Sequence, residues 1–162
     1  MPEQKKVLIV DDSVANADLL EALLVNFNFM ALKAYSGEEA LSLTEKESPD
    51  LVLMDVMMPG MSGFQVCEKL RENPSFSNVP IIIVTAKAKE ESDIIESLEK
   101  GVDDYIFKPV NGEDLSKKVS ILLAKAKKGE LPSQYYLELQ KARKEGMGNV
   151  LTDYCRLCNL DS

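Results

Sequence analysis

The sequence has no histidine, no tryptophan and only three cysteines among its 162 residues. The absence of histidine excludes His-based acid–base catalysis and His-ligated metals. Three cysteines are too few, and odd in number, for a disulfide framework. No apolar run approaches the roughly 18 residues of a membrane span, and the N-terminus lacks the apolar core of a signal peptide. These absences lead us to expect a cytoplasmic protein without a membrane segment.

Positive charge is also scarce, and much of it lies near the C-terminus. Residues 1–124 contain 12 Lys and Arg against 22 Asp and Glu, a net charge of −10, whereas residues 125–162 contain 7 against 5, a net charge of +2. Nonspecific nucleic-acid binding depends on Lys and Arg that neutralise phosphates. We therefore expect no nucleic-acid partner for this chain.

Short apolar runs alternate with amphipathic segments along most of the chain. Apolar runs without a polar alternation are typical of strands buried on both faces of a parallel sheet, and the segments between them have helical spacing and capping residues. The pattern predicts an α/β fold, a doubly wound five-stranded parallel sheet with helices on both faces. The expected strands are 7–10, 30–35, 51–54, 81–84 and 105–107, and the expected helices are 14–27, one that begins at a capping box at 36–39, 63–72, 89–100 with Gly101 after it, and 111–126 with Asn111 as its cap.

Polar side chains follow four of these apolar runs. Asp11 and Asp12 follow the first, Asp55 ends the third, Thr85 follows the fourth and Lys108 follows the last. Right-handed crossovers bring the carboxyl ends of all strands to one edge, where such sheets bind ligands. Together these groups could hold a metal and a phosphoryl group. Singly, the acidic pair could be a helix cap, the threonine a turn residue and the lysine a surface residue.

Residues 5–124 resemble the receiver domain of two-component response regulators, the fold of the chemotaxis response regulator. The resemblance implies a flavodoxin-like sheet of order 2-1-3-4-5. It rests on four motifs in sequence order, namely Val10-Asp11-Asp12-Ser13, Met54-Asp55-Val56-Met57-Met58-Pro59-Gly60-Met61-Ser62-Gly63, Thr85-Ala86, and Tyr105-Ile106-Phe107-Lys108-Pro109.

The resemblance also implies a phosphoryl acceptor and a metal. Asp55 would accept a phosphoryl group from a histidine kinase or a histidine phosphotransfer protein. Mg²⁺ prefers oxygen ligands, and it would be held by Asp11, Asp12, Asp55 and the backbone carbonyl of Met57, with Asp12 the direct ligand of the acidic pair. No organic cofactor is implied.

The remaining motif residues would serve the phosphorylated state. Lys108 would pair with a phosphoryl oxygen, and its peptide bond to Pro109 would be cis. Thr85 would donate its hydroxyl to the phosphoryl group and, together with Tyr105, would switch the face formed by residues 89–126. By the resemblance, self-catalysed phosphorylation and hydrolysis would be the only chemistry of the protein, which would not be a metabolic enzyme.

The C-terminal part departs from the simplest receiver. We expect a receiver domain at 1–126 and a helical C-terminal extension at 127–162, which could dock on the receiver, form a homodimer, bind a partner or act as a linker. A helix is expected at 133–145, and Gly146-Met147-Gly148 should break it. Apolar residues then recur at Val150, Leu151, Tyr154, Leu157 and Cys158, and the three cysteines Cys67, Cys155 and Cys158 are expected to be packing residues.

Three outputs are compatible with a receiver sequence. The chain could be a stand-alone switch that binds a downstream protein, or the regulatory part of a larger effector such as a cyclase, kinase or transcription factor. It could also be a scaffold that binds its partner without phosphorylation.

Overall fold

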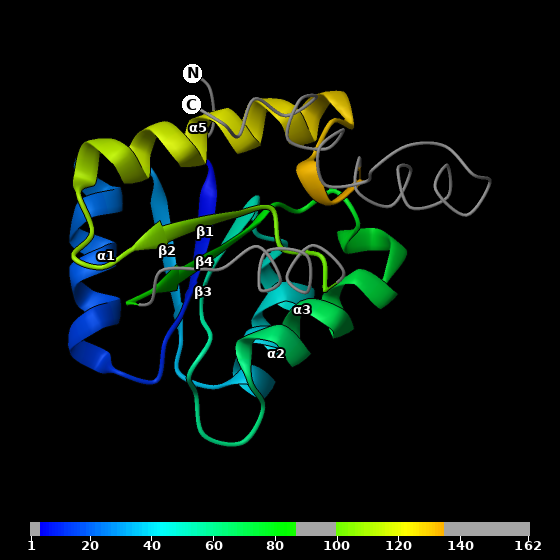
Figure 1. The fold of residues 1–162 in the computed structure, drawn as a ribbon, viewed down its shortest axis with the longest axis horizontal. Helices are drawn as coiled ribbons and strands as arrows, with labels where there is room; N and C mark the ends of the chain where they lie inside the picture. Colours follow the sequence, from blue (N-terminus) through cyan, green and yellow to red (C-terminus); the bar gives the residue numbers. More distant parts are fainter. Residues whose placement is uncertain (1–3, 87–99, 135–162) are drawn as a thin grey trace.

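The computed structural model describes residues 4–86 and 100–134, which form three layers (Figure 1). A sheet of five parallel strands in the order β2-β1-β3-β4-β5 lies between two layers of helices. The predicted fold class and strand order are therefore confirmed. The strands are β1 (Lys6–Val10), β2 (Met30–Ala34), β3 (Leu51–Asp55), β4 (Ile81–Thr85) and β5 (Asp104–Phe107).

Among the described residues, two helices cover each face of the sheet. α1 and α5 pack on one face, and α2 and α3 pack on the other. The helix expected at 89–100 and the one expected at 133–145 lie almost wholly outside the described residues. The described helices are α1 (Val14–Asn26), α2 (Gly37–Glu47), α3 (Gly63–Glu72), the short 3₁₀ helix η1 (Pro74–Phe76) and α5 (Gly112–Lys128).

The central strands divide their side chains between two hydrophobic cores. Successive residues of a strand point to opposite faces of the sheet. In β1, Val7 and Ile9 therefore join the core under α1 and α5, whereas Leu8 and Val10 join the core under α2 and α3. The first four residues of β3 and of β4 alternate in the same way, which explains why all of them are apolar.

The capping box predicted at 36–39 is only half formed. Ser36 caps α2 through the Glu39 backbone N–H, but Glu39 accepts from the Tyr35 N–H, at 3.3 Å, so the reciprocal bond of a capping box is absent there. The complete capping box begins α3, where Ser62 and Gln65 bond each other's backbone N–H groups. These bonds satisfy donors that a helix N-terminus would otherwise leave unpaired.

The chain continues against the body beyond α5. Gly129 ends α5 with φ +71°, and the next apolar side chain, Leu131, is fully buried in the core beneath α5. The division between receiver and extension at residue 126 stays a prediction. Within 4–86 and 100–134, no helix is both long and apolar enough to cross a membrane.

Candidate functional site

The carboxyl ends of the strands bring the predicted site residues to one edge of the sheet. Asp11 directly follows β1, and Asp55 is the last residue of β3. Thr85 ends β4 opposite Phe107 of β5, and its carbonyl accepts the Lys108 N–H at 2.9 Å. Residues separated by almost a hundred positions thus share one edge because parallel strands end together.

Three carboxylates converge at this edge. One carboxylate oxygen each of Asp11, Asp12 and Asp55 lies within 4.8 Å of the others. Asp11 is buried and its Oδ1 accepts the Ser13 N–H at 2.9 Å, whereas Asp12 is exposed. Ser13 itself caps α1 through the Asn16 N–H, so the cap is the serine and not the acidic pair.

The donor set fits Mg²⁺. This ion takes oxygen ligands at about 2.0–2.1 Å in an octahedron, so opposite ligands lie about 4.2 Å apart. Carboxylate oxygens within 4.8 Å of one another need to close only slightly to share such an ion. Exposed Asp12 is free to ligate directly, whereas buried Asp11 is already engaged by the Ser13 N–H.

The electrostatics of Asp55 reflect this crowding. Partial burial raises the pKa of its carboxyl, and the charges of Asp11 and Asp12 raise it further. The Met57 N–H, which donates to Asp55 Oδ1 at 3.2 Å, and the charge of Lys108 both act to lower this pKa. A cation between the carboxylates would relieve the repulsion that raises the pKa.

A glycine lets β3 lie close to α3. A Cβ on Gly63 would lie 2.4 Å from the Asp55 carbonyl oxygen and 3.0 Å from the Met54 side chain. The Gly63 N–H also donates to the Val56 carbonyl, at 3.2 Å. In the sequence, Gly63 was only the first residue of an expected helix and the last of a motif, and no local pattern predicted this close approach.

The last strand carries the predicted switch residue. The rings of Tyr105 and Phe107 stack with centroids 6.4 Å apart, and Phe107 is 47% exposed. Lys118 of α5 donates to the Tyr105 carbonyl at 2.6 Å, which ties β5 to α5. The Lys108–Pro109 peptide bond is cis, as the resemblance implies.

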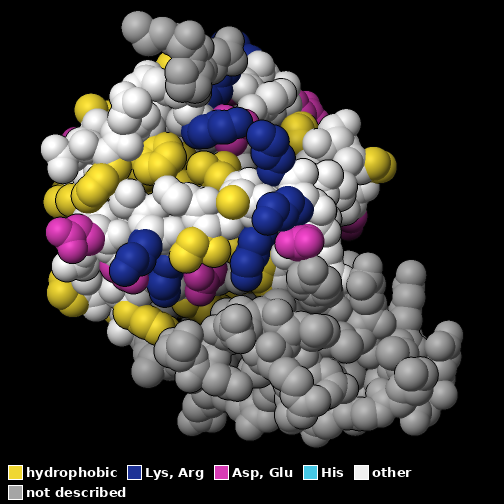
Figure 2. Space-filling model, turned by 90° about the horizontal axis from the view of Figure 1, so that it is seen from above, with side chains coloured by type: hydrophobic (Ala, Val, Ile, Leu, Met, Phe, Trp, Pro, Cys, Tyr) yellow, Lys and Arg dark blue, Asp and Glu magenta, His cyan; other side chains and the backbone are white. Residues whose placement is uncertain are grey.

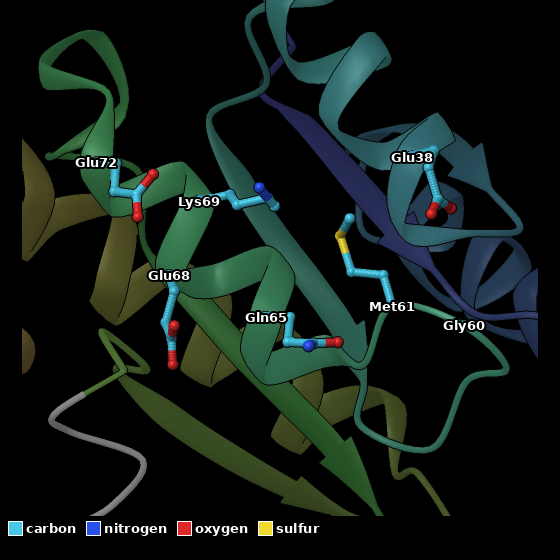
Figure 3. A pocket seen from close by; sticks show the side chains of 7 residues that line it. All are labelled: Glu38, Gly60, Met61, Gln65, Glu68, Lys69 and Glu72. Atoms are coloured by element: carbon cyan, nitrogen blue, oxygen red, sulfur yellow. The ribbon is translucent and has the colours of Figure 1, made fainter.

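A hollow in the described surface lies apart from the carboxylate cluster. The hollow of about 470 Å³ in Figure 3 lies between α2, α3 and the loop that precedes α3, and no predicted site residue lines it. The hollow is lined by Glu38, Gly60, Met61, Gln65, Glu68, Lys69 and Glu72.

Comparison with known families agrees with this geometry. The family described as the response regulator receiver domain matches residues 7–120. The chain belongs to the response regulator receiver family. Receiver domains of two-component systems are phosphorylation switches that interact with histidine kinases and downstream effectors, and they generally bind Mg²⁺.

Individual relatives differ in length. The protein PilH of Pseudomonas aeruginosa is 40% identical over 119 residues, which cover 74% of this chain and 98% of PilH. The response regulator PleD of Caulobacter vibrioides is 41% identical over 106 residues, 65% of this chain and 23% of PleD. A probable transcriptional regulator, ycf27 of Guillardia theta, is 38% identical over 130 residues, 80% of this chain. The chain spans half the length of ycf27 and less than a quarter of PleD.

Solved structures show the same fold. A putative response regulator from Chloroflexus aurantiacus superposes with a TM-score of 0.71 at 35% identity, covering 75% of this chain and 99% of that one. The chemotaxis protein CheY4 of Vibrio cholerae has a TM-score of 0.70 at 29% identity, covering 74% of this chain and 99% of its own.

Proposed function

We propose that this protein is a signalling switch that accepts a phosphoryl group on Asp55. The observation that carries the proposal is the convergence of Asp11, Asp12 and Asp55 on one edge of the sheet. At this edge Thr85 ends β4 and Lys108 follows β5. The phosphoryl donor would be a histidine kinase or a histidine phosphotransfer protein, in keeping with the family. The cytoplasmic location expected from the sequence stays a prediction.

In the proposed reaction, Asp55 is the nucleophile. A carboxylate oxygen of Asp55 attacks phosphorus and forms an acyl phosphate, while the bond from phosphorus to the donor breaks and its electron pair leaves with the donor. The Met57 N–H donates to Oδ1 at 3.2 Å and so orients the carboxylate. Because phosphoryl transfer depends mainly on positioning and charge neutralisation, this fixed orientation is the main contribution of β3.

The other site residues stabilise charge around the phosphoryl group. Asp12, Asp11, Asp55 and the Met57 carbonyl would hold Mg²⁺, which when bound neutralises negative charge on the phosphoryl oxygens. The Lys108 ammonium pairs with a phosphoryl oxygen, and the Thr85 hydroxyl donates to another. Thr85 and Tyr105 then move together as the switch.

The output would pass through the surface of β5 and α5. Phe107 and Ile121 are 47% and 50% exposed, so this surface offers apolar side chains to a protein partner. Tyr105 stacks on Phe107, so a movement of Tyr105 changes what the partner meets. Residues 89–99 of the proposed 89–126 face lie outside the described residues.

A second candidate is a regulatory receiver within a larger effector. It is favoured by PleD and ycf27, of which this chain matches only a part, whereas PilH favours a stand-alone switch. The reading frame after Ser162 distinguishes the two, since a stop codon there supports the stand-alone switch and an open frame supports the effector.

Intact-mass measurement after incubation with acetyl phosphate and Mg²⁺ tests the proposed chemistry. Wild type should gain the mass of one phosphoryl group, and Asp55→Asn should gain none. Asp18→Asn, which removes an exposed carboxylate of α1, is the matched control and should behave as wild type. Equal modification of wild type and Asp55→Asn would exclude Asp55 as the acceptor.

A further inference from the structure

The N-terminal edge of the sheet, opposite the carboxylate cluster, carries a groove that the proposed function does not use. The groove has a volume of about 490 Å³ and lies between α5 and the segments that lead into β1, β3 and β4. Its wall is largely apolar, and charged side chains lie at its rim. The lining residues are Lys5, Pro49, Asp50, Asn78, Val79, Leu123, Ala124, Ala126 and Lys127.

The described part of the chain ends at the rim of this groove. Gln134, the last described residue, donates through Nε2 to Asn78 Oδ1 at 2.6 Å, and Asn78 lines the groove. Leu131 is fully buried and Ser133 is 4% exposed, so the three or four residues before the exit are embedded in the body. Residues 131–134 are therefore held in place against the body.

A buried carboxylate, that of Asp103, anchors residues 131–134 through the Ser133 N–H. Asp103 accepts the Ser133 N–H at 3.0 Å, and its other oxygen accepts from Arg71 Nη2 and from the Ile81 N–H, both at 2.9 Å. The Leu131 N–H donates to Gln134 Oε1 at 3.0 Å, which is half of a capping box, and a proline follows at the first helical position. A helix begins here, and a negative charge at its N-terminus stabilises it.

Segments 133–145 and 149–160 are of similar length, so a reversal between them would bring the chain back to the groove. A helix over 133–145 would extend about 20 Å from this anchor at 1.5 Å per residue. The glycines at 146 and 148 would allow a reversal, and residues 149–160 would cover about 18 Å on the way back. A second helix over 149–160, on which the apolar residues from Val150 to Cys158 would form one stripe, would bring the chain back to the rim that Asn78 forms.

The chemistry of this second segment complements the groove. Its apolar residues recur at helical spacing and could cover Val79, Leu123 and Ala126. The two charged residues of the segment, Asp153 and Arg156, have groove-lining residues of opposite charge, namely Lys5 and Lys127 for the acid and Asp50 for the base. Figure 2 shows the neighbouring outer face of the body, where Lys and Arg side chains lie among hydrophobic ones.

We propose that residues 149–160 of the same chain bind in this groove and cap the N-terminal edge of the sheet. The tether makes binding intramolecular, with an effective concentration of about millimolar, so a modest intrinsic affinity suffices. The occupied surface lies at the edge opposite Asp55. The extension would therefore leave the phosphoryl donor's approach open and be separate from the proposed acceptor chemistry.

Disulfide trapping in the full chain tests the location of the segment. The variant Ala124→Cys/Cys155→Ser retains Cys158 on the apolar stripe and places a thiol on the groove wall. Its control, Ala15→Cys/Cys155→Ser, places the thiol on an exposed position of α1 near the carboxylate edge. Cys67 is fully buried and should not compete. In a glutathione redox buffer, the intramolecular disulfide should form at least about tenfold faster in the Ala124→Cys variant, the ratio that about 1.4 kcal/mol of docking would give.

Two results would overturn the proposal. Equal rates in the two variants would mean that residues 149–160 have no preferred site. A disulfide between two chains at Ala124→Cys, with none inside one chain, would assign the groove to a second copy.

Hydrogen exchange provides a check without new thiols. The variant Leu151→Asp/Leu157→Asp should speed amide exchange in residues 121–128 by about tenfold if docking contributes about 1.4 kcal/mol of protection. The matched control Thr152→Asp/Asn159→Asp adds the same charge on the opposite side of the predicted helix and should leave exchange there unchanged. Equal exchange in both variants and wild type would refute docking, whereas the phosphorylation of Asp55 should be unaffected by any of these changes.

Discussion

Replacement of Asp103 by alanine should destabilise the protein strongly. The Asp103 side chain is fully buried and accepts three N–H donors, from Arg71, Ile81 and Ser133. The change removes the charge partner of Arg71 and leaves two backbone donors without an acceptor. Loss of one partner of a buried ion pair typically lowers the free energy of unfolding by about 3–5 kcal/mol. We take the cost of the unsatisfied backbone donors as part of this range.

The structure places the expected loss at the lower end of this range. Arg71 would keep other acceptors, because its guanidinium also donates to the carbonyls of Gly101, Phe76 and Ser77. We therefore expect Asp103→Ala to lower the free energy of unfolding by about 3–4 kcal/mol. With a urea m-value of about 2 kcal/mol per molar, the midpoint would fall by about 1.5–2 M.

Urea unfolding followed by circular dichroism measures this loss. The matched control is Glu47→Gln, which removes one charge from the partly exposed pair between Glu47 and Lys6, 3.8 Å apart. Surface pairs contribute about 0–1 kcal/mol, so the control should shift the midpoint little. A loss for Asp103→Ala no larger than that for Glu47→Gln would refute the role assigned to the buried carboxylate.

Three further predictions concern the site and the core. Folding raises the pKa of Asp55, so its contribution to the free energy of unfolding is fully present below the unfolded pKa and is lost as pH rises through the folded pKa. Metal-free Asp55→Asn, which cannot ionise, should therefore be more stable than wild type at about pH 8. Unfolding curves recorded near about pH 3 should show no such gain. Lys108→Ala should slow phosphorylation of Asp55 by about a hundredfold in single-turnover assays, because the positive group proposed to face the phosphoryl oxygens is lost. A rate within a factor of two of wild type would contradict its role. Burial raises the pKa of the Cys67 thiol to about 12, so a Cys155→Ser/Cys158→Ser variant should react with a thiol reagent only after unfolding, and rapid labelling of the native protein would show that the thiol is accessible.

The sequence predicted the sheet and its polar edge because both depend on local patterns. Strands apolar at every position can only be buried on both faces, and parallel strands place their carboxyl ends together. The meeting of Asp11, Asp12 and Asp55 followed from these two rules. Their roles in the chemistry came from the family resemblance and are tested only by experiment.

Long-range contacts could not be predicted in the same way. Asp103 stands in a short acidic stretch that is typical of a solvent-exposed turn, and only the fold brings Arg71 and Ser133 to it. The same holds for Gly63. Position 63 has no room for a side chain because α3 lies so close to β3, and this distance is a property of the fold. Ser62 and Gln65 have the spacing of a capping box, but we did not predict one there because Ser62 lies among turn residues.

Chemical mapping of the phosphorylated residue tests the central proposal most directly. Borohydride reduces an acyl phosphate to an alcohol, so an aspartyl phosphate becomes homoserine, whereas a phosphorylated serine or threonine is unchanged. After incubation with acetyl phosphate and Mg²⁺, peptide mass spectrometry should find homoserine at position 55, and only when Mg²⁺ is present. A phosphoryl group on a hydroxyl residue, or homoserine at a position other than 55, would contradict the assignment of Asp55 as the acceptor.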